Sequence, residues 1–233
     1  MTTPHILRDF DNSISTLKGE VLKMAAHTRH NLERAVQALL TRNKELANSV
    51  IADDDEVDNA ERIIDQLGMD ILVKYHPMAT DLRFVVSSMK ISMNLERIAD
   101  HATTIAKRSK KIMASSELND VTLIEPLYTL ADHLLRDAVS SYSDGNATLG
   151  ASLHARDKEL DQMHKDTTAH YGSRLEQMSG RCQDYLHLIF IVRSLERVGD
   201  LASNIGEDSV FLEQAKDIRH LSRSERELND DYD

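Results

Sequence analysis

Hydrophobic side chains recur every three or four residues along most of this chain, which is the period of an amphipathic α-helix. A first stripe covers residues 14–39, and the polar residues 41–43 interrupt it. A second stripe covers residues 50–71 and should end before Pro77, because proline cannot continue a helix. A third covers residues 84–105 with alternating steps of four and three, the rhythm of a bundle seam. The first part of the chain is therefore predicted to hold three long helices.

The same pattern then starts again, after a polar linker predicted at residues 114–117. Three further helical stripes cover residues 127–138, 153–171 and 188–205. The chain from residue 216 to 233 is polar and charged, and we expect it to be frayed or to form a loose last helix.

The two halves share residues at matching positions, which indicates an internal duplication. Residues 95–100 (LERIAD) match residues 195–200 (LERVGD). Their offset differs slightly from the constant offset between residues 32–58 and residues 135–161. The offset changes at the loop that holds Pro77, where changes of length are tolerated. The earlier matches pair Leu32, Ala35, Val36, Asn43, Leu46, Ser49, Ala52, Asp54, Glu56 and Asp58 with Leu135, Ala138, Val139, Asn146, Leu149, Ser152, Ala155, Asp157, Glu159 and Asp161.

The sequence therefore predicts an all-α protein made of two tandem three-helix bundles. We expect the first bundle in residues 1–115, the second in residues 116–215 and a polar tail in residues 216–233. The composition agrees, because 8 Gly and 3 Pro are too few to turn the many short strands of a β-sandwich or barrel.

Charge and cysteine content narrow the class of protein further. A net charge of −11 argues against binding the phosphate backbone of a nucleic acid. The single cysteine, Cys182, excludes a disulfide framework or a thiolate zinc site and suits a reducing cytoplasm. We expect no signal peptide, and the longest apolar stretch is far shorter than the roughly 20 residues that span a bilayer. Any membrane contact is expected to go through a partner.

The candidate chemistry lies in paired acids spaced four residues apart. Each half has one pair near the start of its second helix and one midway along its third, and these helices should be antiparallel neighbours. Acids at this spacing share one helix face and repel by ~0.2–0.5 kcal/mol per pair. A hard multivalent cation, which prefers carboxylate oxygens, would offset that repulsion. The pairs are Asp54/Asp58, Glu96/Asp100, Asp157/Asp161 and Glu196/Asp200.

Spacing alone leaves other interpretations open. Acids are favoured at helix N-termini, and this account fits Asp54 and Asp157. Arg97 and Arg197 offer ordinary surface ion pairs to the acids of the third helices, worth ~0–1 kcal/mol each. Because the chain has 39 acids, a metal site and a solvated acidic face remain alternatives on this observation.

His101 and His164 lie beside the acid pairs and are candidate additional ligands, since histidine suits borderline transition metals. No glutamate has a histidine three residues later, so the ligand motif of ferritin-like di-iron enzymes is missing. Neither a nucleophile elbow nor a phosphate-binding loop is found. A hydrolase with a carboxylate-bound metal remains an alternative, although no feature of the sequence supports it.

At these acid pairs the sequence resembles the PhoU family of bacterial phosphate-signalling regulators. The resemblance implies two tandem three-helix bundles, each with two E/D-x-x-x-D motifs that ligate multinuclear metal clusters on the bundle surface. Residues 77–83 (PMATDLR) also resemble the family, and the likeness runs from about residue 10 to residue 211. It implies divalent or multinuclear metal (iron, zinc, manganese or magnesium) bound by Asp54, Asp58, Glu96, Asp100, Asp157, Asp161, Glu196 and Asp200.

The chain departs from the family pattern in three places, one of which is that the second half lacks the Asp-Leu-Arg run of residues 81–83. Ala99 stands where the family usually has glycine, which Gly199 retains in the second half. The acid that often follows the second-helix motif is Glu61 in the first half but is replaced by His164 in the second. We therefore expect the two sites to differ in affinity or in preferred metal.

The resemblance further implies a regulator and not an enzyme. Such a protein restrains phosphate uptake and phosphate-starvation signalling, acting with the ATPase of the phosphate ABC transporter and with a membrane sensor histidine kinase. It implies a cytoplasmic homodimer, peripheral to the inner membrane through these partners, whose acidic faces dock basic partner surfaces. The alternatives are a helical interaction module without metal and a carboxylate-metal hydrolase.

Overall fold

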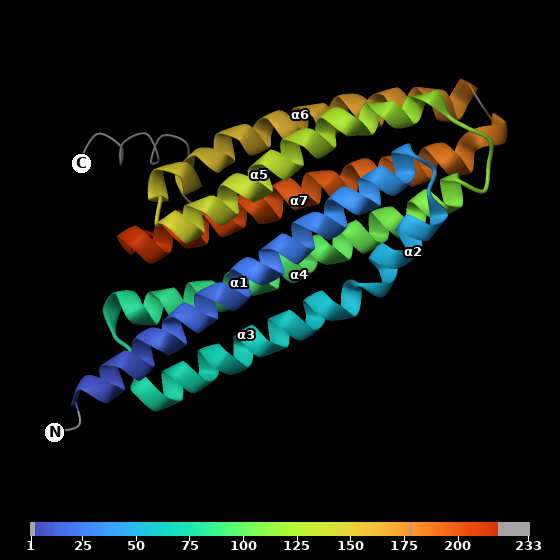
Figure 1. The fold of residues 1–233 in the computed structure, drawn as a ribbon. Helices are drawn as coiled ribbons and strands as arrows, with labels where there is room; N and C mark the ends of the chain where they lie inside the picture. The colour runs from blue at the N-terminus through green and yellow to red at the C-terminus, as the bar shows by residue number, and fades with distance from the viewer. Residues whose placement is uncertain (1–2, 178, 219–233) are drawn as a thin grey trace.

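The computed structural model describes residues 3–177 and 179–218 and is helical nearly throughout (Figure 1). No strand occurs in the described part, so the all-α prediction is confirmed. The predicted tail lies outside the described residues except for residues 216–218, which form no helix. The helices are α1 (Thr3–Leu40), α2 (Lys44–Ala52), α3 (Asp54–Tyr75), α4 (Ala79–Ile112), α5 (Ile124–Asp144), α6 (Ala147–Gln177) and α7 (Cys182–Gln214), with short 3₁₀ turns η1 (Asn119–Leu123) and η2 (Ser179–Arg181).

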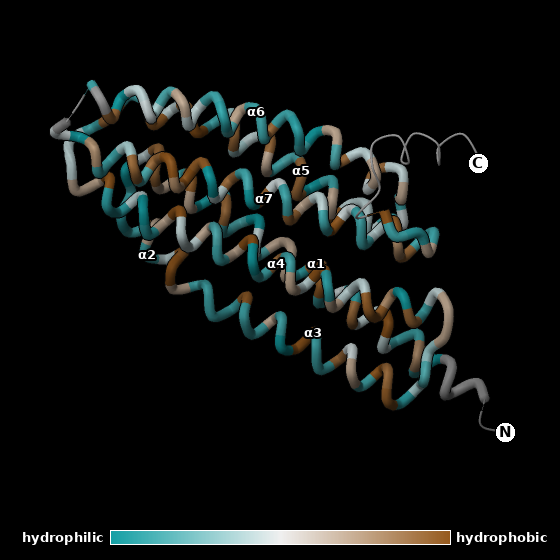
Figure 2. Tube along the Cα trace, turned by 180° about the vertical axis from the view of Figure 1, so that it is seen from behind, coloured by the Kyte–Doolittle hydropathy of each residue, from teal (hydrophilic) through white to brown (hydrophobic). Residues whose placement is uncertain are grey.

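The long helices run side by side in two bundles that share one hydrophobic core (Figure 1). The first bundle contains α1 to α4 and the second α5 to α7; α4 packs along α7, and α1 packs against α5. In Figure 2 hydrophobic and hydrophilic stretches alternate along each helix, as expected of amphipathic helices. None of the described helices is both long and apolar enough to cross a bilayer.

The internal duplication extends to single hydrogen bonds. Asn43 and Asn146 each cap the following helix, accepting a hydrogen bond from the backbone amide three residues later at 2.9 and 3.0 Å. The residue before each asparagine has a left-handed backbone conformation, with φ of 53° at Arg42 and 65° at Gly145. Glycine adopts this conformation without a Cβ clash, whereas Arg42 is held there by contacts of its side chain.

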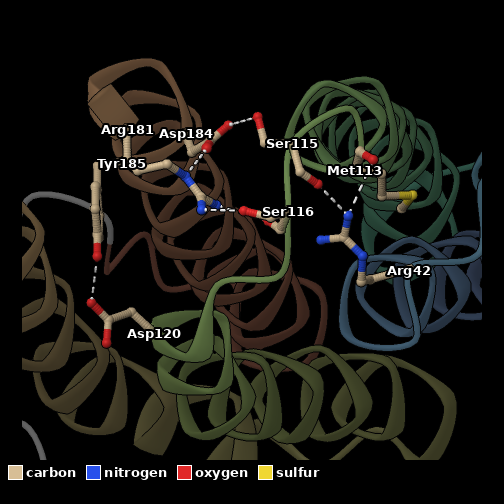
Figure 3. A network of polar contacts seen from close by, with 8 residues as sticks. All are labelled: Arg42, Met113, Ser115, Ser116, Asp120, Arg181, Asp184 and Tyr185. Carbon is tan, nitrogen blue, oxygen red and sulfur yellow. Dashed lines mark hydrogen bonds and ion pairs between the residues drawn. The ribbon is translucent and has the colours of Figure 1, made fainter. Parts of the chain in front are cut away.

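Those contacts tie the predicted linker to both halves (Figure 3). The guanidinium of Arg42 donates to the carbonyl oxygens of Met113 and Ser115 at 3.1 and 2.5 Å. From the other half, Arg181 donates to the carbonyl oxygen of Ser116 at 2.8 Å. The segment therefore connects α4 to η1 as predicted, but it is clamped by an arginine on each side.

The second helix of the first half is not continuous as predicted, because it breaks at Asp53 between α2 and α3. The corresponding helix of the second half, α6, runs through without a break. Three consecutive acids (residues 53–55) favour a helix N-terminus, whereas residues 156–158 read Arg-Asp-Lys and carry no such run. The N-terminal explanation is thus right for Asp54, the first residue of α3, and wrong for Asp157, which lies well inside α6.

An ion pair crosses the same position in both halves with its charges exchanged. In the first half Arg34 on α1 binds Asp53 at 2.6 Å, and in the second Asp137 on α5 binds Arg156 on α6 at 2.5 Å. The duplicated unit has kept the contact while reversing which helix supplies each charge.

Candidate metal centres

The first acidic cluster forms where the start of α3 meets the middle of α4. The hydroxyl of Thr103 on α4 donates to Asp54 at 3.0 Å and so holds the first turn of α3 against α4. Burial raises the pKa of Asp54, and the charges of Asp100 and Asp58 add to the shift. The two acid pairs of the first half therefore face one another across these helices.

Glu96 is the most perturbed carboxyl of this cluster. The pKa of Glu96 is raised to about 7, mainly by partial burial and then, in decreasing order, by the charges of Asp100, Glu61, Asp58 and Asp54. Burial also raises the pKa of Glu61, which lies half-buried on α3. Glu61 thus lies near the carboxylates of this cluster, while its role as a metal ligand stays a prediction.

The second acidic cluster lies between α6 and α7. Carboxylate oxygens of Asp161, Glu196 and Asp200 lie within 4.8 Å of one another. Asp157 lies beneath them with 9% of its surface exposed. Burial raises the pKa of Asp157 to about 7, and the charges of Asp200, Asp161, Glu196 and Glu207 add to the shift.

Arg197 gives the second cluster a neutralising cation from within the protein. Its guanidinium donates to Asp200 at 2.8 Å and lies 3.4 Å from a carboxylate oxygen of Glu196. In the described part of the chain, Arg97 at the matching position of the first half makes no ion pair. The surface ion-pair interpretation therefore describes one cluster and not the other.

The two candidate histidines occupy different places. His164 lies close enough to the second cluster to lower the pKa of Glu196 and of Asp200, although burial raises both overall. His101 lines a groove between α4 and α7 that it shares with Arg197. The structure thus brings His164 toward the carboxylates, while His101 as a ligand stays a prediction.

The difference between Ala99 and Gly199 has a packing reason. A Cβ on Gly199 would lie 2.4 Å from the side chain of Leu160 and 2.8 Å from the carboxylate of Asp157. Glycine at this position lets Leu160 and the buried Asp157 pack against α7 without having to shift.

Two neighbours of the acidic clusters were missed from the sequence. Thr103 lies three residues after Asp100, and Glu207 lies seven after Asp200, so each continues the helix face of an acid pair. The residue that matches Glu207 in the first half is Lys107, whose charge lowers the pKa of Asp54. A search of the whole face at heptad spacing would have found both.

The donor type of both clusters suits a hard cation, but among the described residues only the second brings three carboxylates within 4.8 Å of one another. All of the paired ligands are carboxylates, the oxygen donors preferred by magnesium, calcium and manganese ions. Burial raises the pKa values of Glu96 and Asp157, the crowding of like charges adds to it, and a bound cation would offset both effects. His164 would add a nitrogen donor to the carboxylates of the second cluster, and such a donor also suits borderline transition metals.

Comparison with known proteins gives a consistent match. The PhoU domain family matches the chain twice, over residues 21–109 and 124–209, one copy in each half. The chain is 30% identical over 219 residues to the "phosphate-specific transport system accessory protein PhoU homolog" of Zymomonas mobilis subsp. mobilis, covering 94% of this chain and 92% of the relative. It is 29% identical over 217 residues to PhoU homolog 1 of Thermotoga maritima, covering 92% and 93%. The crystal structure of PhoU from Pseudomonas aeruginosa superposes with a TM-score of 0.86 at 27% identity, over 89% of this chain and 100% of that one.

Proposed function

Because this chain belongs to the PhoU family, we propose that it is a negative regulator of phosphate uptake and phosphate signalling that works with metal bound at its two acidic clusters. Family membership makes it a phosphate-transport regulatory protein and not an enzyme, which confirms the prediction on both points. The carboxylate-metal hydrolase is thereby set aside.

The grouping of Asp161, Glu196 and Asp200 carries the metal part of this proposal. These residues would hold one site, with Asp157 and His164 beside them. The other site would be held by Asp54, Asp58, Glu61, Glu96 and Asp100. A bound cation supplies positive charge, which offsets the carboxylate repulsion and joins α3 to α4 and α6 to α7.

The names of the relatives support the proposed partners. Accessory proteins of a phosphate-specific transport system act beside that transporter, so we place this chain in the cytoplasm at its ATPase. Coupling to a sensor histidine kinase follows from the family resemblance, as does a homodimer. Sedimentation of the purified chain measures the oligomeric state, and a monomer at micromolar concentration would contradict the dimer.

Complementation in cells tests the proposed function. Deleting the gene should derepress phosphate-starvation genes in phosphate-rich medium, and the wild-type chain should restore repression. A variant that replaces Asp58, Asp100, Asp161 and Asp200 by asparagine should fail, because asparagine keeps the shape but loses the charge needed for metal. The control Glu45→Gln/Glu159→Gln changes exposed acids outside the clusters and should restore repression. Full repression by the quadruple variant would contradict a metal-dependent regulator.

Co-purification tests the partners separately. A tagged wild-type chain should recover the transporter ATPase and the histidine kinase from cells grown in phosphate-rich medium. Repeated recovery of neither protein would contradict this part of the proposal and favour a different regulatory partner.

A further inference from the structure

A groove between α4 and α7 collects positive charge on this acidic protein. The two helices lie side by side at the centre of the molecule (Figure 1). One hollow of the groove, about 320 Å³, is lined by Arg108, Arg193 and Arg197 together with His101. No carboxylate lines this hollow among the described residues. Both halves contribute arginines, so the hollow exists only in the assembled fold.

Arg108 is held in place by its neighbours, although its Nε lacks a hydrogen-bond acceptor among the described residues. Its guanidinium stacks on the ring of Phe190, 3.9 Å from the centroid, and one terminal nitrogen lies 3.4 Å from a ring nitrogen of His187. Its Nε is buried and has no hydrogen-bond partner in the described part of the chain. The stacking and the contact with His187 orient the guanidinium before any ligand arrives, so an incoming anion would find a pre-oriented cation.

Size and donor geometry favour a compact oxyanion. The planar fork of arginine matches the oxygens of a phosphoryl group, and three such side chains converge on one hollow. Its volume suits a small molecule, since ligand pockets span roughly 300–1,000 Å³. Phe190, which is 42% exposed, adds an apolar wall. We propose that this hollow binds the phosphoryl group of a small phosphate-bearing ligand.

A long acidic peptide fits the same groove poorly. The neighbouring hollow shares His101 and Arg197 but is also lined by Asp157, Asp200 and Glu207. An extended acidic chain would run from the arginines onto these carboxylates, whereas a compact anion stays clear of them.

Arg197 links this hollow to the second acidic cluster. The same guanidinium that lines the hollow is paired with Asp200 and Glu196. A cation on those carboxylates competes for their oxygens and frees Arg197 for the anion. Metal and phosphoryl ligand are therefore expected to bind with positive coupling, and by linkage each raises the affinity for the other. The coupling, unlike the hollow itself, rests on the proposed metal site.

Calorimetric titration of the chelator-treated full chain tests the hollow without metal. Inorganic phosphate and phenyl phosphate are the two probes, because only the second can use the wall formed by Phe190. The wild type should bind at least one of them with a dissociation constant in the millimolar range or below. Arg193→Gln changes an exposed side chain and should weaken binding at least tenfold, and Arg62→Gln, an exposed arginine of α3, should leave it unchanged.

The outcomes separate the hollow from the metal site. No binding of either probe, equal binding by Arg193→Gln, or equal loss in Arg62→Gln would overturn the proposed hollow whatever the metal content. After reloading with manganese, phosphate should bind more tightly to the wild type but not to Arg193→Gln. A gain that survives in Arg193→Gln would show phosphate held by the metal itself and would overturn the coupling.

Discussion

Two carboxyl groups of the acidic clusters have strongly raised pKa values. Burial raises the pKa of Asp157 from 3.8 to about 7 and that of Glu96 from 4.5 to about 7. A raised pKa means that the folded state holds the proton more tightly than the unfolded chain. The contribution of each group to stability is therefore complete below its unfolded pKa and is lost as the pH rises through about 7.

We expect the metal-free protein to become less stable as the pH rises from about 4 to about 7, which is the interval between the unfolded and the folded pKa values of these two groups. The urea midpoint of chelator-treated protein should fall over this window, and Asp157→Asn should show a smaller fall because its amide cannot ionise. The control is Glu159→Gln, which changes an exposed acid of the same helix. Its urea midpoint should fall as much as that of the wild type. An equally steep fall of the urea midpoint in Asp157→Asn would contradict the raised pKa assigned to Asp157.

Gly199 also has a role that can be measured, because Leu160 and Asp157 pack closely against it. Gly199→Ala places a methyl group against Leu160 and Asp157, and overpacking of this kind costs ~1–3 kcal/mol. We expect lower stability in urea and weaker metal binding at the second cluster only. The matched control is Ala99→Gly, which makes the first half resemble the second and costs ~0.5–1 kcal/mol through helix propensity. Unchanged stability and metal binding in Gly199→Ala would show that α6 has room to move.

The individual residues of the two clusters also show how much of the candidate site could be predicted from the sequence. Spacing of four found every paired acid, because residues four apart share a helix face whatever the tertiary fold. It could not show that Arg197 neutralises one cluster, since arginine also stands at position 97, where the structure records no such pair. The contact depends on side-chain packing between helices, which periodicity does not encode.

At the scale of elements, hydrophobic period and polar breaks predicted the long helices and the linker. The break at Asp53 was missed because the apolar stripe continues through it from Val50 to Val57. What ends α2 there is local, an acidic run that favours a new N-terminus and an ion pair to Arg34. Residues 156–158 keep the apolar stripe without the acidic run, and α6 continues.

The exchanged ion pair gives a test of the duplication. Asp137→Arg sets like charges against Arg156 and should destabilise the protein, by ~1 kcal/mol for a half-buried surface pair. The double variant Asp137→Arg/Arg156→Asp copies the arrangement of the first half and should regain most of that loss. Urea denaturation of the wild type, both single variants and the double variant measures the coupling. A double variant as unstable as the sum of the single variants would show that the contact contributes nothing.

On the scale of the whole molecule, the two bundles meet through the helices that carry the acids. Glu96 and Asp100 lie on α4, Glu196 and Asp200 lie on α7, and these two helices pack along each other. One hydrophobic core spans both bundles, and a bidentate pair between Arg29 and Asp132 joins α1 to α5 at 2.6 and 2.9 Å. The sequence showed the repeat but not this shared core, because helical stripes do not specify which helices of the two bundles meet.

A shared core predicts one unfolding transition for the whole chain. A metal that binds only the folded state should raise the melting temperature of that single transition. Calorimetry of the metal-free and the metal-loaded protein checks this. Two transitions, of which only one moves with metal, would show that the bundles unfold independently.

The central claim, that both acidic clusters hold metal, is tested most directly by elemental analysis of protein purified without chelator. Asp58→Asn/Asp100→Asn should lose the metal of the first cluster and keep that of the second, and Asp161→Asn/Asp200→Asn should do the reverse. The variant with all four changes should carry none, while Glu45→Gln/Glu159→Gln should match the wild type. Equal metal content in the wild type and the fourfold variant would contradict the account and leave the clusters as solvated acidic faces.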